Sequence, residues 1–284
     1  MPTILACTDG SIYGASICQH TAWAAERMTA EVKLLHVIDH HRERTPNMDL
    51  SGAIGIDASV ELTEELTKLE EAEGRVARIK GKAILEEAQR QLTAAGISNA
   101  TATQRHGALP ETLEELEPAV DLVVIGKRGE HADFEKGTLG ENLETVVRIS
   151  VRPVLVASRA FKPIKRMLIA FDDSASARKA VDYVSSQPLL RGLECMLLMV
   201  GRADAAHENS LKQAEEKLKT AGYNVTAQLK AGSAAYVIAE EVKANNIDLL
   251  VMGAFGHSTL REFILGSTTR SVVQNCRVPV LMFR

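Results

Sequence analysis

Short apolar runs alternate along this chain with longer stretches in which apolar residues recur at helical spacing. The short runs are rich in Val, Ile and Leu and are apolar on both sides, which is typical of strands buried inside a parallel sheet. Each half of the chain has the order strand, helix, strand, helix, strand, helix, strand, helix, strand. Strands that alternate with helices indicate right-handed βαβ units. We therefore predict an α/β fold with a parallel sheet in each half.

The two halves of the chain repeat the same pattern. Three pairs of corresponding positions, each at or just after the end of an apolar run, mark the repeat: Asp9 and Asp172, Val37 and Val200, and Gly126 and Gly253. The first two pairs are 163 residues apart, whereas the third pair is 127 apart. The first half therefore holds about 36 additional residues between its second and fourth strands. A repeat of this length predicts two similar domains in tandem.

The additional residues divide into a loop and a helix. Residues 39–60 contain Pro46, Gly52 and Gly55 and are predicted to form a loop. Residues 60–95 have helical spacing of Leu62, Leu66, Leu69, Val76 and Ile79, and their charges change from acidic to basic along the segment. Two interpretations stay open for this helix: a solvated amphipathic face, or a surface that docks a partner.

The segment Phe161–Lys165 is the natural linker between the halves. It places one domain at residues 1–159 and the other at residues 164–284. Because the linker is short, we expect the domains to pack together.

The composition narrows the class of protein. The chain has 284 residues, of which 45% are hydrophobic and 25% charged, the balance of a globular protein with two domains of ordinary size. A net charge of −4 gives no reason to expect a nucleic-acid partner, because neutralising phosphates requires a basic face. No apolar stretch is long enough to span a membrane, and the N-terminus lacks the basic region of a signal peptide. The four cysteines show no CxxC pairing, so we predict free buried thiols and a cytoplasmic protein.

A glycine-rich segment in the second half carries the clearest chemical signal. Gly253 directly follows a predicted strand, Gly256 comes three residues later, and Gly266-Ser267 begins a predicted helix. Glycines allow the backbone to approach a phosphate closely, and the first N–H groups of a helix face an anion placed there. Ser267 and Thr268 add hydroxyl donors. The spacing matches neither G-x-G-x-x-G nor G-x-x-x-x-G-K-[ST].

The pattern G-2x-G-9x-G-S, in a repeat whose first strand leads into Asp172, resembles the nucleotide-binding signature of the universal stress protein family. Both halves are similar to that family along nearly the whole chain. The resemblance implies two doubly wound, flavodoxin- or Rossmann-like sheets of five strands in the order 3-2-1-4-5, related by a pseudo-two-fold axis. Strands 1 and 4 then meet at the switch point where open α/β sheets bind ligands.

The family motif also implies roles for single residues, with ATP, alone or with Mg²⁺, as the ligand. Asp172, Val200 and the backbone of Ala170 would contact the adenosine part. Six residues would surround the phosphates: Gly253, Gly256, His257, Gly266, Ser267 and Thr268. Simpler interpretations stay open, in which Asp172 caps the following helix, Val200 belongs only to the core and the glycines serve tight turns.

The first half departs from this signature. Gly126-Lys127-Arg128-Gly129 is followed by ten residues before Gly140, one more than in the second half, and Glu141 stands where a hydroxyl is expected. A carboxylate there repels a triphosphate. We predict no ATP in the first half, although Asp9, Lys127 and Arg128 leave room for a different ligand.

Three functions compete. The first is an ATP-binding protein of stress response or signalling that changes state or partner with nucleotide occupancy. The second is a nucleotide-cleaving enzyme, for which His257 is the only plausible base and no carboxylate pair for Mg²⁺ is evident. We assign no catalytic or metal-binding residue and expect at most a slow ATPase. The third is an interaction scaffold whose glycine loops are relics.

The resemblance also implies pairing through the last strand of each domain. Residues 154–156 and 280–282 form these strands, and such apolar edges are normally covered. In a tandem chain the two halves can form an intramolecular pseudo-dimer. Whether two chains then associate as a homodimer is left open.

Overall fold

The computed structural model of the protein describes residues 1–39, 56–127, 140–254 and 266–284. The elements of the first half are β1 (Thr3–Cys7), α1 (Gly14–Met28), β2 (Glu31–Ile38), α2 (Ile56–Ala94), β3 (Thr101–His106), α3 (Leu109–Leu116), β4 (Leu122–Gly126), α4 (Glu141–Ile149) and β5 (Val154–Ala157). Those of the second half are β6 (Arg166–Ala170), α5 (Ala175–Ser186), β7 (Glu194–Val200), α6 (Ala205–Thr220), β8 (Val225–Lys230), α7 (Ala234–Ala244), β9 (Leu249–Gly253), α8 (Ser267–Asn275) and β10 (Val280–Phe283). Short 3₁₀ turns lie at Glu117–Ala119 and Pro188–Leu190.

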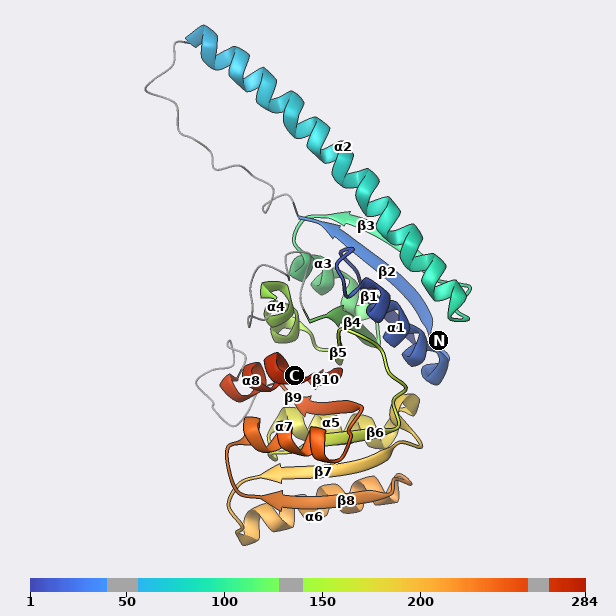
Figure 1. Ribbon diagram of the computed structural model, residues 1–284, viewed down its shortest axis with the longest axis vertical. Helices are drawn as coiled ribbons and strands as arrows, with labels where there is room; N and C mark the ends of the chain where they lie inside the picture. The colour runs from blue at the N-terminus through green and yellow to red at the C-terminus, as the bar shows by residue number, and fades with distance from the viewer. Residues whose placement is uncertain (40–55, 128–139, 255–265) are drawn as a thin grey trace.

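The described strands form one ten-stranded sheet in the order β3-β2-β1-β4-β5-β10-β9-β6-β7-β8. Each half therefore has the strand order 3-2-1-4-5, and the predicted doubly wound α/β fold is confirmed. Neighbouring strands within a half are parallel. The halves meet where β5 and β10 pair antiparallel, with Leu155 opposite Leu281. Figure 1 shows the two halves joined at this point.

The strands in the middle of each half are buried on both faces. Every residue of β1 and β4 is buried, and so is every residue of β9 except the last. One hydrophobic core contains Ile4 and Ala6 and lies against α1, α2, α5 and α6, whereas the other contains Leu5 and Cys7 and lies against α3, α4, α7 and α8. Because consecutive side chains of a strand point to opposite faces, these cores lie on the two sides of the sheet. Each core draws residues from both halves, so the halves share their packing.

Helix α2 begins earlier than predicted, at Ile56 rather than residue 60. Residues 56–60 contain neither Gly nor Pro, so the helix continues up to the last breaker, Gly55. The rest of the predicted loop, residues 40–55, lies outside the described residues. Only the C-terminal part of α2 packs on the sheet, where Leu85 and Leu92 are buried. Figure 1 shows the N-terminal part of α2 projecting past β2 and β3.

None of the helices in the described ranges combines the length and the apolar character that crossing a membrane requires.

Candidate functional site

The carboxyl ends of three neighbouring strands of the second half meet at the switch point of its sheet. Ala170 ends β6, Val200 ends β7 and Gly253 ends β9, and all three are half-buried. Strand β6 lies between β7 and β9, with Ala170 opposite Leu198 on one side and Met252 on the other. The structure thus brings together three residues that are far apart in the sequence.

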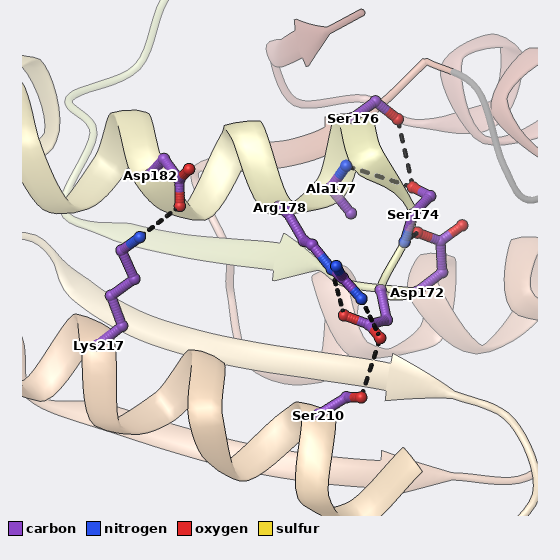
Figure 2. A network of polar contacts seen from close by, with 9 residues as sticks. Asp172, Ser174, Ser176, Ala177, Arg178, Asp182, Ser210 and Lys217 are labelled. Carbon is purple, nitrogen blue, oxygen red and sulfur yellow. Dashed lines mark hydrogen bonds and ion pairs between the residues drawn. The ribbon is translucent and has the colours of Figure 1, made fainter. Parts of the chain in front are cut away.

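Asp172 lies in the tight turn between β6 and α5. The backbone N–H of Ser174 donates to its Oδ1 at 3.1 Å, and the side chain is exposed. Ser174 is the N-cap of α5, because its Oγ accepts a hydrogen bond from the backbone N–H of Ala177 at 3.3 Å. Figure 2 shows both bonds and the contact between the Ser174 and Ser176 hydroxyls. The alternative interpretation of Asp172 as the helix cap is therefore wrong: it orders the turn, and Ser174 caps the helix.

Asp173 fixes this turn to the neighbouring helix. Its backbone has φ of 61°, a left-handed conformation that Asp tolerates better than most residues. Its carboxylate makes two bonds of 2.8 Å with the guanidinium of Arg178 and accepts a hydrogen bond of 2.9 Å from Ser210 on α6. Sequence reasoning missed these roles of Asp173 and Ser174, although a Ser placed just before an apolar helical repeat is a common capping signal.

The start of α8 lies beside the end of β9. Ala254, which follows Gly253, donates from its backbone N–H to the carbonyl of Phe283 at 2.7 Å and accepts at its own carbonyl from Thr269 Oγ1 at 3.1 Å. Gly266 is the N-cap of α8, and the helix begins at Ser267 as predicted. Thr268 is exposed at this helix terminus. Gly256 and His257 lie outside the described residues.

Gly253 is required by packing within the protein. A Cβ at this position would overlap Ser176 Oγ and come within 3.0 Å of the backbone nitrogen of Ala177. The absence of a side chain thus lets the start of α5 lie against the end of β9. Gly266 is different, because a Cβ there would meet its nearest neighbour, Thr269 Oγ1, at 3.4 Å.

The first half repeats this geometry. Asp9 Oδ1 accepts a hydrogen bond of 3.0 Å from the backbone N–H of Ser11, and the residue between them, Gly10, has φ of 76°. Gly140 is the N-cap of α4, which begins at Glu141, so Glu141 and Ser267 hold the same first helical position in the two halves. Arg128 and Gly129 lie outside the described residues.

Lys127 connects the first crevice to the second half. Its side chain is buried, and its ammonium donates a hydrogen bond to the carbonyl of Cys276, which follows α8. Nearby, Arg270 of α8 and Glu144 of α4 form an ion pair of 2.6 Å. The helices that follow the two glycine-rich segments are therefore joined across the β5–β10 boundary, where Figure 1 shows them close together.

A cavity of about 100 Å³ lies in the crevice of the first half, between the ends of β1 and β4 and the start of α4. Its polar lining includes Asp9, Asp39, Lys127 and Asn142.

In the described part of the chain, nothing supports a reactive thiol or a metal-binding site. Cys7 also lines the cavity, but burial, with a smaller effect of Asp9, raises the pKa of its thiol to about 12. All four cysteines are free and buried, as predicted. Among the residues that the structure describes, no group of three or more His, Cys, Asp or Glu side chains could hold a metal ion.

Comparison with known proteins agrees with this architecture. The model of the universal stress protein family matches residues 1–158 and 163–284. The curated universal stress protein Slr1230 of Synechocystis sp. is 36% identical over 287 residues, which cover 100% of both chains. A universal stress protein structure from Archaeoglobus fulgidus, 22% identical, covers 99% of this chain and 98% of its own with a TM-score of 0.72, which shows the shared fold. Because the family model matches both halves and a full-length relative exceeds 30% identity, this chain belongs to the universal stress protein family.

Proposed function

We propose that the second domain binds one ATP and that the protein acts in stress response or signalling by changing its state or partner with nucleotide occupancy. The observation that supports this proposal best is the convergence at one switch point of Asp172, the ends of β6, β7 and β9, and the start of α8. A crevice at the carboxyl ends of parallel strands is where doubly wound sheets bind ligands. The first N–H groups of α8 give that crevice an anion-binding terminus.

Each predicted residue has a place in the proposed complex. Asp172, Val200 and the backbone of Ala170 contact the adenosine part. The phosphates lie against Gly253, the N-terminus of α8 and the segment between them. The other residues proposed to contact the phosphates are Gly256, His257, Gly266, Ser267 and Thr268. Mg²⁺ bound with ATP would neutralise part of the phosphate charge.

Adenine nucleotides occur in other solved universal stress proteins, one in complex with cAMP and one from Arabidopsis thaliana with AMP bound. These structures cover 43% and 42% of this chain. The proposal for this chain therefore rests on its own residues.

We also propose that residues 1–159 and 164–284 act as an intramolecular pseudo-dimer. The antiparallel β5–β10 pair, the Glu144–Arg270 ion pair and the Lys127 hydrogen bond all cross between the halves. A nucleotide that orders the start of α8 would thereby influence α4 and the first crevice. Because the residues that the structure describes form no metal-carboxylate cluster, we expect ATP hydrolysis that is slow at most.

Identification of the ligand in freshly purified protein tests the proposed function. Denaturation should release an adenine nucleotide, which chromatography and mass spectrometry would identify, and calorimetry on the stripped protein should show that ATP rebinds. Protein that carries no nucleotide and binds no added ATP would overturn the proposal in favour of a scaffold with relic loops.

A further inference from the structure

Helix α2 is longer than its position in the fold requires. It has 39 residues, whereas α6, which connects the corresponding strands of the second half, has 16. Within α2, Gly81 marks where packing begins, since a Cβ there would overlap His36 on β2 and Gln104 on β3. The N-terminal part of α2 extends past β2 and β3 (Figure 1). At about 1.5 Å per residue, the segment 62–80 alone spans about 28 Å.

An apolar stripe runs along this projecting segment. Leu66 is 50% exposed, Leu69 52%, Val76 65% and Ile79 70%. We call Leu62, Leu66, Leu69, Val76, Ile79 and Ala83 the α2 stripe. Isolated helices are marginally stable in water, and their stability in proteins comes mostly from packing of an apolar face. A regular stripe this exposed indicates a surface that is covered in the functional assembly.

The spacing of the α2 stripe is symmetric about its centre. Leu62 and Ala83, Leu66 and Ile79, and Leu69 and Val76 lie at equal distances from a midpoint between residues 72 and 73. An antiparallel pair of identical helices related by a two-fold axis requires this symmetry, because each residue must meet its counterpart at the same height. In such a pair Leu66 lies opposite Ile79, and Leu69 opposite Val76.

The net charge beside the stripe changes sign at the same midpoint. Residues 62–72 contain four glutamates and Lys68, a net charge of −3, whereas residues 73–83 contain Glu73 and four basic residues, a net charge of +3. An antiparallel partner therefore lays its basic half along the acidic half, with Glu65 near Lys80 of the second copy, because both residues lie close to the centre line of the stripe at about 100° per residue. A parallel pair would place like charges together, and an anionic membrane would be repelled by the carboxylates.

We propose that two copies of this protein associate through an antiparallel pairing of their α2 helices along the α2 stripe. The two chains then form an isologous dimer that is independent of the β5–β10 contact within each chain and of nucleotide binding.

The oligomeric state of the full-length protein provides the first test. Sedimentation velocity should show a dimer, and Leu69→Asp should convert it to a monomer, because a carboxylate would lie in the centre of the apolar layer. The matched control is Tyr236→Asp, which changes a 67% exposed side chain on α7 and should leave the dimer intact. A wild-type monomer at about 100 µM, far above a micromolar Kd, would overturn the proposal, as would a dimer that survives Leu69→Asp.

Charge reversal provides a test that unfolding cannot imitate. Glu65→Arg and Lys80→Glu should each raise the dimer Kd at least tenfold, and the double variant should restore it, because residue 65 of one copy lies opposite residue 80 of the other. Equal loss in the double and single variants would contradict the antiparallel register.

Cross-linking tests the position of the axis. Ala72→Cys lies at the centre and should form a disulfide-linked dimer on mild oxidation, whereas Ala83→Cys should not, since it lies about 30 Å along the helix from its own copy. The native cysteines are buried and give little background. Cross-linking of both variants, or of neither, would overturn the proposal.

Discussion

Asp172 and Asp9 hold the same turn in the two halves, each accepting a hydrogen bond from the backbone N–H two residues later. Asp172→Ala and Asp9→Ala should therefore destabilise their turns to a similar extent. If ATP binds only at the second crevice, Asp172→Ala alone should weaken ATP binding, by at least tenfold or about 1.4 kcal/mol. Calorimetric titration of both folded variants checks this expectation. Equal ATP affinity for the two variants would show that Asp172 does not contact the nucleotide.

Gly253→Ala is expected to destabilise the protein by about 1–3 kcal/mol, the usual cost of adding a methyl group to a tightly packed site. The new Cβ would press on Ser176 and on the backbone of Ala177, which cannot move freely. The control is Gly14→Ala at the start of α1, where the nearest atom, Thr8 Oγ1, is 3.7 Å away. Urea unfolding should show a loss for the first variant and none for the second. If Gly253→Ala left the stability unchanged, the close approach of a phosphate alone would explain why this position is a glycine.

At single positions the sequence showed which residues are important better than it showed what each residue does. It identified Gly253 as a site of close approach, but the approaching group in the structure is the start of α5. It left open that Asp172 caps the following helix, although the cap is Ser174. Turn hydrogen bonds depend on which of several adjacent polar residues reaches a particular N–H, and residue composition does not determine that choice. The neighbouring sequence also does not predict the role of Lys127, because its partner Cys276 is 149 residues away.

At the scale of elements, α5 and α7 differ in how they begin. Ser174 caps α5 with its side chain, whereas Ser233, the N-cap of α7, makes no side-chain cap bond. Ser174→Ala should therefore cost about 1 kcal/mol of unfolding free energy, and Ser233→Ala distinctly less. Chemical denaturation of the two variants provides the comparison. If both lose the same stability, the N-cap bond of Ser174 contributes nothing beyond the propensity of serine.

The placement of strands and helices was predictable because buried parallel strands and amphipathic helices have different apolar periods. The strand order followed from the resemblance to the universal stress protein family. The start of α2 at Ile56 was not, because helix termini without a clear cap depend on weak local preferences. The exposure of Leu66 and Val76 was also not predictable. Periodicity shows which residues share a face of a helix, but only the tertiary structure shows whether that face is covered.

At the scale of the whole molecule, buried thiols make stability depend on pH. Burial raises the pKa of Cys195 to about 12 from an ordinary value of 9.0. The unfolded chain therefore loses this proton first, and stability falls as pH rises from about 9 towards 12, by up to about 1.4 kcal/mol per pH unit for each such thiol. Urea unfolding at several pH values should give a shallower decline for Cys195→Ala than for the wild type. Parallel declines would show that this thiol does not titrate on unfolding.

The two domains are expected to be functionally unequal, with ATP in the second crevice only. Glu141 takes the first helical position that Ser267 holds in the second half, and the first loop is one residue longer. A carboxylate about 4 Å from a phosphate costs on the order of 1–4 kcal/mol, depending on the local dielectric. The ammonium of Lys127, which could offset that repulsion, donates to the carbonyl of Cys276 in the other half.

Calorimetric stoichiometry decides between equal and unequal domains. The wild-type chain should bind one ATP, and Asp9→Ala should not change that number. Deleting one residue from 130–139 together with Glu141→Ser should move the first crevice towards a second, weaker site, because both departures from the family signature are then removed. Two equivalent ATP molecules per wild-type chain would refute the asymmetry, since the longer loop and Glu141 would then have no effect on the ligand.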